Sequence, residues 1–238
     1  SYVLGLMAEI AAELGKQADA ERYAGYAAKC REAYSKLRHT KEYPLETKRQ
    51  AELVRPLYMH LLDDADAETA RTNLLRVLED YGWRLGTGFL STPLILYVLA
   101  DMDIEYAYRL LENEEMPGWL FMPKNGATTI WESWEGTQAQ GGIASLNHYS
   151  KGSCVEWLFE GMCGIQVAGE NRFRSAPQPG GHFTYAKASY RSVYGTVESG
   201  WRREEGKTLY TITVPANCTA EVVLAIGCNG GQNTPDSS

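Results

Sequence analysis

The spacing of apolar residues changes near Val167, and this change constrains the fold more than any other feature of the sequence. Before it, apolar side chains recur three and four positions apart, which is the period of an amphipathic α-helix. After it, apolar and polar residues alternate in short runs, which is the period of strands with one buried face. A parallel α/β sheet would need strands that alternate with helices along the chain. The sequence therefore predicts a mainly α protein with β, in which a block of helices precedes a small antiparallel β module.

The helical block is predicted to consist of helices in hairpin succession. Apolar spacing and breaker residues place these helices at about 3–14, 18–37, 46–62, 66–81, 94–100 and 104–114. We expect Gly15 to end the first helix and Pro56 to kink the third. A further helix is expected over 148–165, where apolar residues cover most of the circumference, so that it should be buried.

The β module is predicted from residues 182–227, whose alternating runs indicate four or five antiparallel strands. The clearest hairpin joins GTVESGWRR to TLYTITV through a turn at 204–207. The final residues, GGQNTPDSS, supply no side chains for a core. We accordingly divide the chain into a helical domain over 1–166, a β module over 167–228 and a disordered tail over 229–238.

Charge and composition argue against several classes of function. The formal net charge is -7, and no Lys/Arg cluster is interleaved with aromatic residues, so nucleic acid is not an expected partner. No apolar run is long enough to cross a bilayer, so a membrane is not expected either. The five cysteines form no CxxC, and the four histidines lack a metal-binding spacing: His39, His60, His148 and His182. We therefore expect no metal and no cofactor.

The segment 126–150 is the candidate site. A carboxylate, Glu132, lies between Trp131 and Trp134 in this segment, and the polar trio Asn-His-Tyr follows at 147–149. Indole rings pack on the apolar face of a sugar, while a carboxylate binds hydroxyls or moves a proton, so the pattern suits a carbohydrate site. The alternative is that the indoles are core and Glu132 lies on a solvated helical turn.

Four motifs, in this order, carry a resemblance: GTGFLSTP, GATTIWESWEG, SLNHYSKGSCVEWLFEGMCGI and YGTVESGW. They are similar to the C-terminal half of the catalytic domain of bacterial alpha-L-rhamnosidases, glycoside hydrolase family 78, over roughly 45–226. The resemblance implies part of an (α/α)6 toroid built of helical hairpins, followed by a small antiparallel β-sandwich module. Both parts of the pattern in the chain agree with that plan.

The resemblance also implies a reaction, the inverting hydrolysis of terminal alpha-L-rhamnosides by the full-length enzyme. Inversion requires two carboxyl groups about 6.5–9.5 Å apart, with room for a water. By resemblance, Glu132 is the general base and His148 a ligand of a sugar hydroxyl. The hydrophobic wall of the sugar site is expected from Trp119, Trp131 and Trp134.

Other carboxylates compete for these roles. Glu135 lies close to Glu132 in sequence, and Glu156 follows His148 and is expected to be structural. By resemblance, the family's general acid lies in an acid-rich segment followed by Trp, and this sequence has no convincing counterpart. The acidic run at 63–68 has no aromatic neighbours and is expected to be a solvated turn. We therefore expect a fragment that lacks the general acid and is inactive by itself.

Two alternative functions stay open, namely a carbohydrate-binding module without catalysis and a toroid glycosidase that acts on another sugar. The expected partner is a rhamnosylated glycan or glycoside. Self-association is also expected, because half a toroid exposes apolar helix faces. The resemblance implies a bacterial protein and leaves periplasmic, cytoplasmic and secreted locations open.

Overall fold

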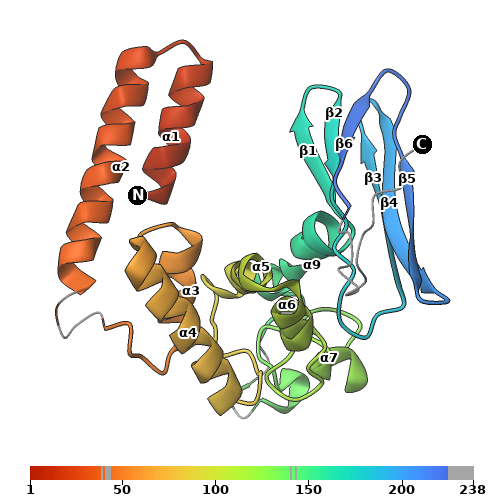
Figure 1. Ribbon diagram of the computed structural model, residues 1–238. Coiled ribbons are helices and arrows are strands. Elements are labelled where there is room, and N and C mark those ends of the chain that lie inside the picture. The colour runs from red at the N-terminus through yellow and green to blue at the C-terminus, as the bar shows by residue number, and fades with distance from the viewer. Residues whose placement is uncertain (39, 41–43, 140, 143, 225–238) are drawn as a thin grey trace, which may run out of the picture. The chain divides into compact units, whose positions relative to one another are not determined.

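We describe the protein from a computed structural model, which covers residues 1–38, 40, 44–139, 141–142 and 144–224 (Figure 1). The chain divides into two compact units, Ser1–Cys154 and Val155–Ser238. Within the described residues, the first unit contains helices and loops, and the strands belong to the second unit. The tail that the sequence predicts over 229–238 lies outside the described residues.

The first two helices form the antiparallel hairpin that the sequence predicts. Helix α1 spans Tyr2–Glu13 and α2 spans Gln17–Arg38, and the two lie side by side (Figure 1). Gly15 lies between them with a φ of 68°, in the left-handed region that glycine adopts without steric cost. Small buried side chains, among them Ala11 and Ala27, line the contact between the helices and allow their close approach.

Four further helices build the core of the first unit. Helix α3 spans Gln50–Tyr58, α4 spans Asp64–Asp80, α5 spans Thr92–Met102 and α6 spans Ile104–Leu111. Helix α3 packs against both α4 and α5, and α5 packs against α6. The core between them consists of aliphatic side chains that are essentially inaccessible to solvent: Leu53, Leu74, Leu78, Ile95, Leu96, Leu99 and Leu110.

Helix α3 is shorter than the predicted 46–62. It contains nine residues, runs through Pro56 and ends at Tyr58. Its first residue, Gln50, is fully buried and links α3 to the loop before α5. The Gln50 Nε2 donates to the carbonyl of Arg84 at 2.8 Å, and its Oε1 accepts from the amide of Gly86 at 2.8 Å.

The acidic run at 63–68 is the start of a helix, which corrects the prediction of a solvated turn. Helix α4 begins at Asp64, and the side chain of Asp63 caps it by accepting from the amide of Asp66 at 2.9 Å. Carboxylates at a helix N-terminus satisfy free amide groups and interact favourably with the helix dipole. The acids are therefore explained by local structure.

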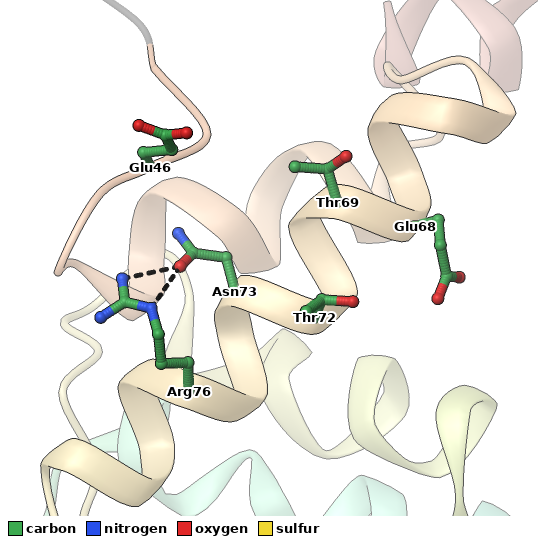
Figure 2. Close-up of a pocket in the computed structure, with 6 residues that line it drawn as sticks. All are labelled: Glu46, Glu68, Thr69, Thr72, Asn73 and Arg76. Atoms are coloured by element: carbon green, nitrogen blue, oxygen red, sulfur yellow. Dashed lines mark hydrogen bonds between the residues drawn. The ribbon is translucent and has the colours of Figure 1, made fainter.

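A groove of about 570 Å³, lined by polar side chains, lies along α4 (Figure 2). Arg76 donates from Nε and Nη2 to the Oδ1 of Asn73, at 2.9 and 2.7 Å. The amide nitrogen of Asn73 in turn donates to the carbonyls of Leu45 and Thr47. These bonds hold the segment before α3 against α4.

The single buried helix predicted over 148–165 is not observed. The structure has α8 at Tyr149–Gly152, α9 at Cys154–Trp157 and a π-helical turn at Leu158–Met162. Trp157 is buried, and a Cβ at Gly161 would lie 2.7 Å from its indole nitrogen, so the π turn wraps closely over the ring. The apolar residues of this stretch thus serve separate short elements, and Val155 is exposed.

The second unit contains two three-stranded sheets within its described residues. One has the order β1-β2-β6, with β1 at Ile165–Gly169, β2 at Arg172–Ser175 and β6 at Thr219–Val222. The β1–β2 pair is antiparallel but β2–β6 is parallel, which departs from the all-antiparallel expectation. Parallel strands need a long connection, and the second sheet supplies it because it lies between β2 and β6 in the sequence.

The second sheet is antiparallel, in the order β3-β4-β5, with β3 at Tyr185–Ser192, β4 at Gly195–Glu204 and β5 at Lys207–Thr213. The predicted hairpin is confirmed, since Glu204 pairs with Lys207 across a two-residue turn. Both turn residues have positive φ, as the tight turns that suit twisted strands require. The hydroxyls of Ser175 and Ser199 lie 2.9 Å apart and connect the two sheets.

Candidate active site

The loop that carries Glu132 is fixed by pairing between two parts of the segment 126–150. The amide of Glu132 donates to the carbonyl of Ser145 at 2.8 Å, and the amide of His148 donates to the carbonyl of Ile130 at 2.8 Å. The hydroxyl of Thr129 also donates to the carbonyl of Leu146. These bonds bring together two residues that are sixteen positions apart, Glu132 and His148.

The Glu132 carboxylate and the His148 imidazole face each other. Glu132 Oε1 lies 3.9 Å from His148 Nε2, and Glu132 Oε2 accepts from the amide of Ser145 at 3.0 Å. The Glu132 side chain is 46% exposed, whereas that of His148 is only 15% exposed. One oxygen of Glu132 is thus anchored while the carboxylate stays open to solvent, an arrangement that can bind a hydroxyl or accept a proton from water.

Aromatic rings surround His148 and fix its orientation. The Tyr149 ring is stacked on the imidazole with centroids 5.6 Å apart, and Phe89 lies edge-on to both rings at 5.5 and 5.4 Å. The hydroxyl of Ser150 donates to the carbonyl of Phe89, so α8 is tied to the loop before α5. Within the described residues, His148 Nδ1 is buried without a hydrogen-bond partner. Phe89 was not identified from the sequence, where only the Gly-rich motif around it was noted.

Trp131 and Trp134 occupy different surroundings. Trp131 is half-buried and, with Glu135, lines a hollow of about 430 Å³. Its ring packs directly on Gly136, where a Cβ would lie 2.3 Å from the indole and where φ is +57°. Trp134 is also half-buried, but its ring meets the ammonium of Lys151, which lies 3.6 Å from the ring centroid.

Lys151 is a component of the site that the sequence analysis missed. Although charged, it is only 9% exposed. Burial lowers the pKa of Lys151 to about 8, and the carboxylates of Glu135 and Glu132 partly oppose this effect. The sequence offers no signal for this lysine, because nothing in its neighbours distinguishes it from a solvated surface residue.

Trp119 is placed in the core of the first unit and not on an open wall. Its side chain is 3% exposed, and its indole N–H donates to the carbonyl of Lys151 at 2.8 Å. Trp119 therefore supports the backbone of α8. The competing carboxylate Glu156 is exposed on α9, in the second unit.

No group of three or more His, Cys, Asp and Glu side chains is arranged to hold a metal ion in the part of the chain that the structure describes. Among the helices formed by the described residues, none has the length and apolar content to span a membrane. Burial raises the pKa of the Cys163 thiol to about 11, which leaves it protonated near neutral pH.

Along the chain, paired antiparallel helices precede a small β module, and a loop of the helical unit places Glu132 beside His148. Residues 1–162 match the family described as the bacterial alpha-L-rhamnosidase 6 hairpin glycosidase domain. Residues 166–235 match the bacterial alpha-L-rhamnosidase C-terminal domain. The chain belongs to the bacterial alpha-L-rhamnosidase family.

Curated relatives carry the same name. An alpha-L-rhamnosidase of Streptomyces avermitilis is 36% identical over 225 residues, which is 91% of this chain and 22% of that protein. An alpha-L-rhamnosidase of Formosa agariphila is 36% identical over 186 residues, which is 75% of this chain and 20% of that protein. The chain thus spans about a fifth of the length of these relatives.

Solved structures show the same similarity. The Streptomyces avermitilis alpha-L-rhamnosidase complexed with L-rhamnose matches with a TM-score of 0.82 and 34% identity, over 93% of this chain and 22% of that chain. The alpha-L-rhamnosidase from Dictyoglumus thermophilum matches with a TM-score of 0.84 and 31% identity, over 92% of this chain and 25% of that chain.

Proposed function

We propose that the protein containing this chain hydrolyses terminal alpha-L-rhamnosides with inversion, and that Glu132 is its general base. The observation that carries the proposal is the Glu132–His148 pair, with 3.9 Å between Oε1 and Nε2 on a loop fixed by backbone hydrogen bonds. The names of the relatives support the substrate class, and one related structure was solved with L-rhamnose.

The proposed step is a single displacement. Glu132 accepts a proton from a water molecule while the oxygen of that water attacks the anomeric carbon. The glycosidic C–O bond breaks at the same time on the opposite face of the sugar. The oxygen of the leaving group takes a proton from a general acid, and the proposal assigns only the base to Glu132. Because attack and departure occur on opposite faces, the released rhamnose has the inverted configuration.

Neighbouring side chains are assigned binding roles. His148 Nε2 lies beside the carboxylate and is placed to hydrogen-bond a sugar hydroxyl. Trp131 and Trp134 are proposed to form the apolar wall against the sugar ring. Trp119, which the sequence analysis placed on that wall, is proposed to act from the core by holding the carbonyl of Lys151.

The test is hydrolysis of p-nitrophenyl alpha-L-rhamnopyranoside by the complete natural polypeptide that contains residues 1–238, compared with its Glu132→Gln variant. Loss of a general base lowers kcat by at least about a hundredfold. Glu156→Gln is the matched control, because Glu156 is an exposed carboxylate outside the proposed site, and its rate should stay within about twofold of wild type.

Three results would contradict the proposal. Full activity of Glu132→Gln would show that this carboxylate is structural. Equal cleavage of the corresponding glucoside would indicate a toroid glycosidase of another specificity. Binding of L-rhamnose without hydrolysis of any aryl glycoside would favour a carbohydrate-binding protein.

A further inference from the structure

Lys151 has surroundings that are unusual for a lysine. Charged residues are rarely fully buried unless they are paired, yet Lys151 is 9% exposed. Its backbone is fixed on two sides, because its carbonyl accepts from the Trp119 indole at 2.8 Å and the preceding Ser150 donates to the carbonyl of Phe89. The backbone that carries the Lys151 side chain is therefore held by the core of the first unit.

The Lys151 ammonium is held against an aromatic face. Nζ lies 3.6 Å from the centroid of the Trp134 ring, well inside the range of a cation–π interaction. Such an interaction is stronger when the cation has lost its water, as burial requires here. Holding the cation also holds the ring, because the two are in direct contact.

The charged groups around Lys151 come from the same loop. Glu135 and Glu132 act on it electrostatically, and His148 and Tyr149 precede it on the chain. Helix α5 packs against α8 and carries two titratable side chains: Tyr97, which contacts Tyr58, and Asp101, which pairs with Arg71 at 3.7 Å. Lys151 thus supplies a cation that interacts electrostatically with the carboxylates of Glu135 and Glu132.

We propose that Lys151 is a positioning residue of the site, whose ammonium fixes the Trp134 ring for contact with the sugar and places a positive charge beside Glu132 and Glu135. The sugar contact rests on the proposed function, whereas the contact between ammonium and indole does not. Lys151 itself touches no reacting atom, so its effect falls on substrate binding more than on turnover.

The direct readout is tryptophan fluorescence of the complete polypeptide, titrated from pH 6 to pH 10. Burial lowers the pKa of Lys151 to about 8, so the ammonium beside Trp134 is present below that pH and is lost above it. Wild type should show an emission change with a midpoint near pH 8. The change should be absent from Lys151→Met, which keeps the length of the stem but not the charge, and from Trp134→Phe. Lys124→Met is the control, because Lys124 is exposed and pairs with Glu114.

The kinetic readout separates positioning from structure. Lys151→Met should raise KM for p-nitrophenyl alpha-L-rhamnopyranoside about tenfold at pH 7, the scale of a partly desolvated cation–π contact, with kcat within about twofold. The wild-type KM should rise as the pH passes 8, whereas the KM of the variant should not change there.

Two outcomes would overturn the proposal: a wild-type fluorescence titration without a transition near pH 8, or a Lys151→Met variant that keeps the transition or the wild-type KM. If the polypeptide cleaves no rhamnoside, the proposed function fails. The fluorescence comparison still shows whether the Lys151 ammonium contacts the Trp134 ring. Failure of Lys151→Met to fold would leave Trp134→Phe and the wild-type titration to decide it.

Discussion

Gly136 shows how one residue without a side chain shapes the candidate site. Its φ of +57° is costly for any residue with a Cβ, and an added Cβ would lie 2.3 Å from the Trp131 ring. The glycine therefore allows the chain to turn directly over the indole. Trp131 is held in place by this close packing.

We predict that Gly136→Ala lowers the free energy of unfolding by about 2–4 kcal/mol, because backbone strain and overpacking act together. Gly126→Ala is the matched control, since Gly126 has a φ of +84° but open space around it. The Gly126→Ala substitution should lower the free energy of unfolding by about 1–2 kcal/mol, from backbone strain alone. Urea unfolding of the two variants measures the difference, and equal losses would show that Trp131 is free to move away from Gly136.

At the scale of elements, the period of apolar residues predicted the helical hairpins well. The pairs α1–α2 and α5–α6 and the β4–β5 hairpin follow from spacing and turn residues, because their contacts are local in sequence. The ends of α3 and the short helices after His148 were not predicted, since the spacing of apolar residues does not show where a helix ends within an apolar run. The parallel β2–β6 pair depends on contacts between distant segments, which periodicity does not encode.

The candidate site was predicted only in part, for a related reason. Glu132, Trp131 and Trp134 were evident because an acid between two indoles is an uncommon local pattern. Phe89 comes from a distant segment and joins the site through the Ser150–Phe89 hydrogen bond, and Lys151, although adjacent in sequence, joins it only through the packing of its side chain on Trp134.

Helix α4 provides a test at the same scale. We predict that Asp63→Ala destabilises the start of α4 by about 1 kcal/mol, because the amide of Asp66 loses its cap. Asp63→Asn is the control, because asparagine caps a helix about as well as aspartate. Hydrogen exchange at the first turn of α4 should become about fivefold faster in the alanine variant only. Equal exchange in both variants would mean that the charge, and not the cap, stabilises this end.

For the whole molecule, the buried charge of Lys151 has two opposite effects: it is proposed to aid sugar binding, and it lowers the free energy of unfolding. Its pKa is lowered from 10.5 in the unfolded chain to about 8 in the folded protein. Below pH 8 both states are protonated and the buried charge costs stability in full. Between about pH 8 and 10.5 the unfolded chain binds more protons, so stability rises with pH.

We therefore predict that Lys151→Met unfolds with a free energy about 1–3 kcal/mol higher than wild type at pH 7, with the contact to Trp134 offsetting part of the gain. The difference should shrink as the pH rises toward 10. Urea unfolding at pH 7 and pH 9.5 tests the sign. A variant that is less stable than wild type at pH 7, or a difference independent of pH, would contradict the prediction.

Residues 1–162 and 166–235 match the two domains of bacterial alpha-L-rhamnosidases, and the central proposal is that Glu132 activates the attacking water. The most direct measurement is the reaction of Glu132→Ala with p-nitrophenyl alpha-L-rhamnopyranoside in the presence of azide, followed by NMR of the product. Azide is a nucleophile that needs no general base, so it should restore p-nitrophenol release by at least about tenfold and give the rhamnosyl azide of inverted configuration. An alanine variant that hydrolyses the substrate at the wild-type rate without azide would contradict the account.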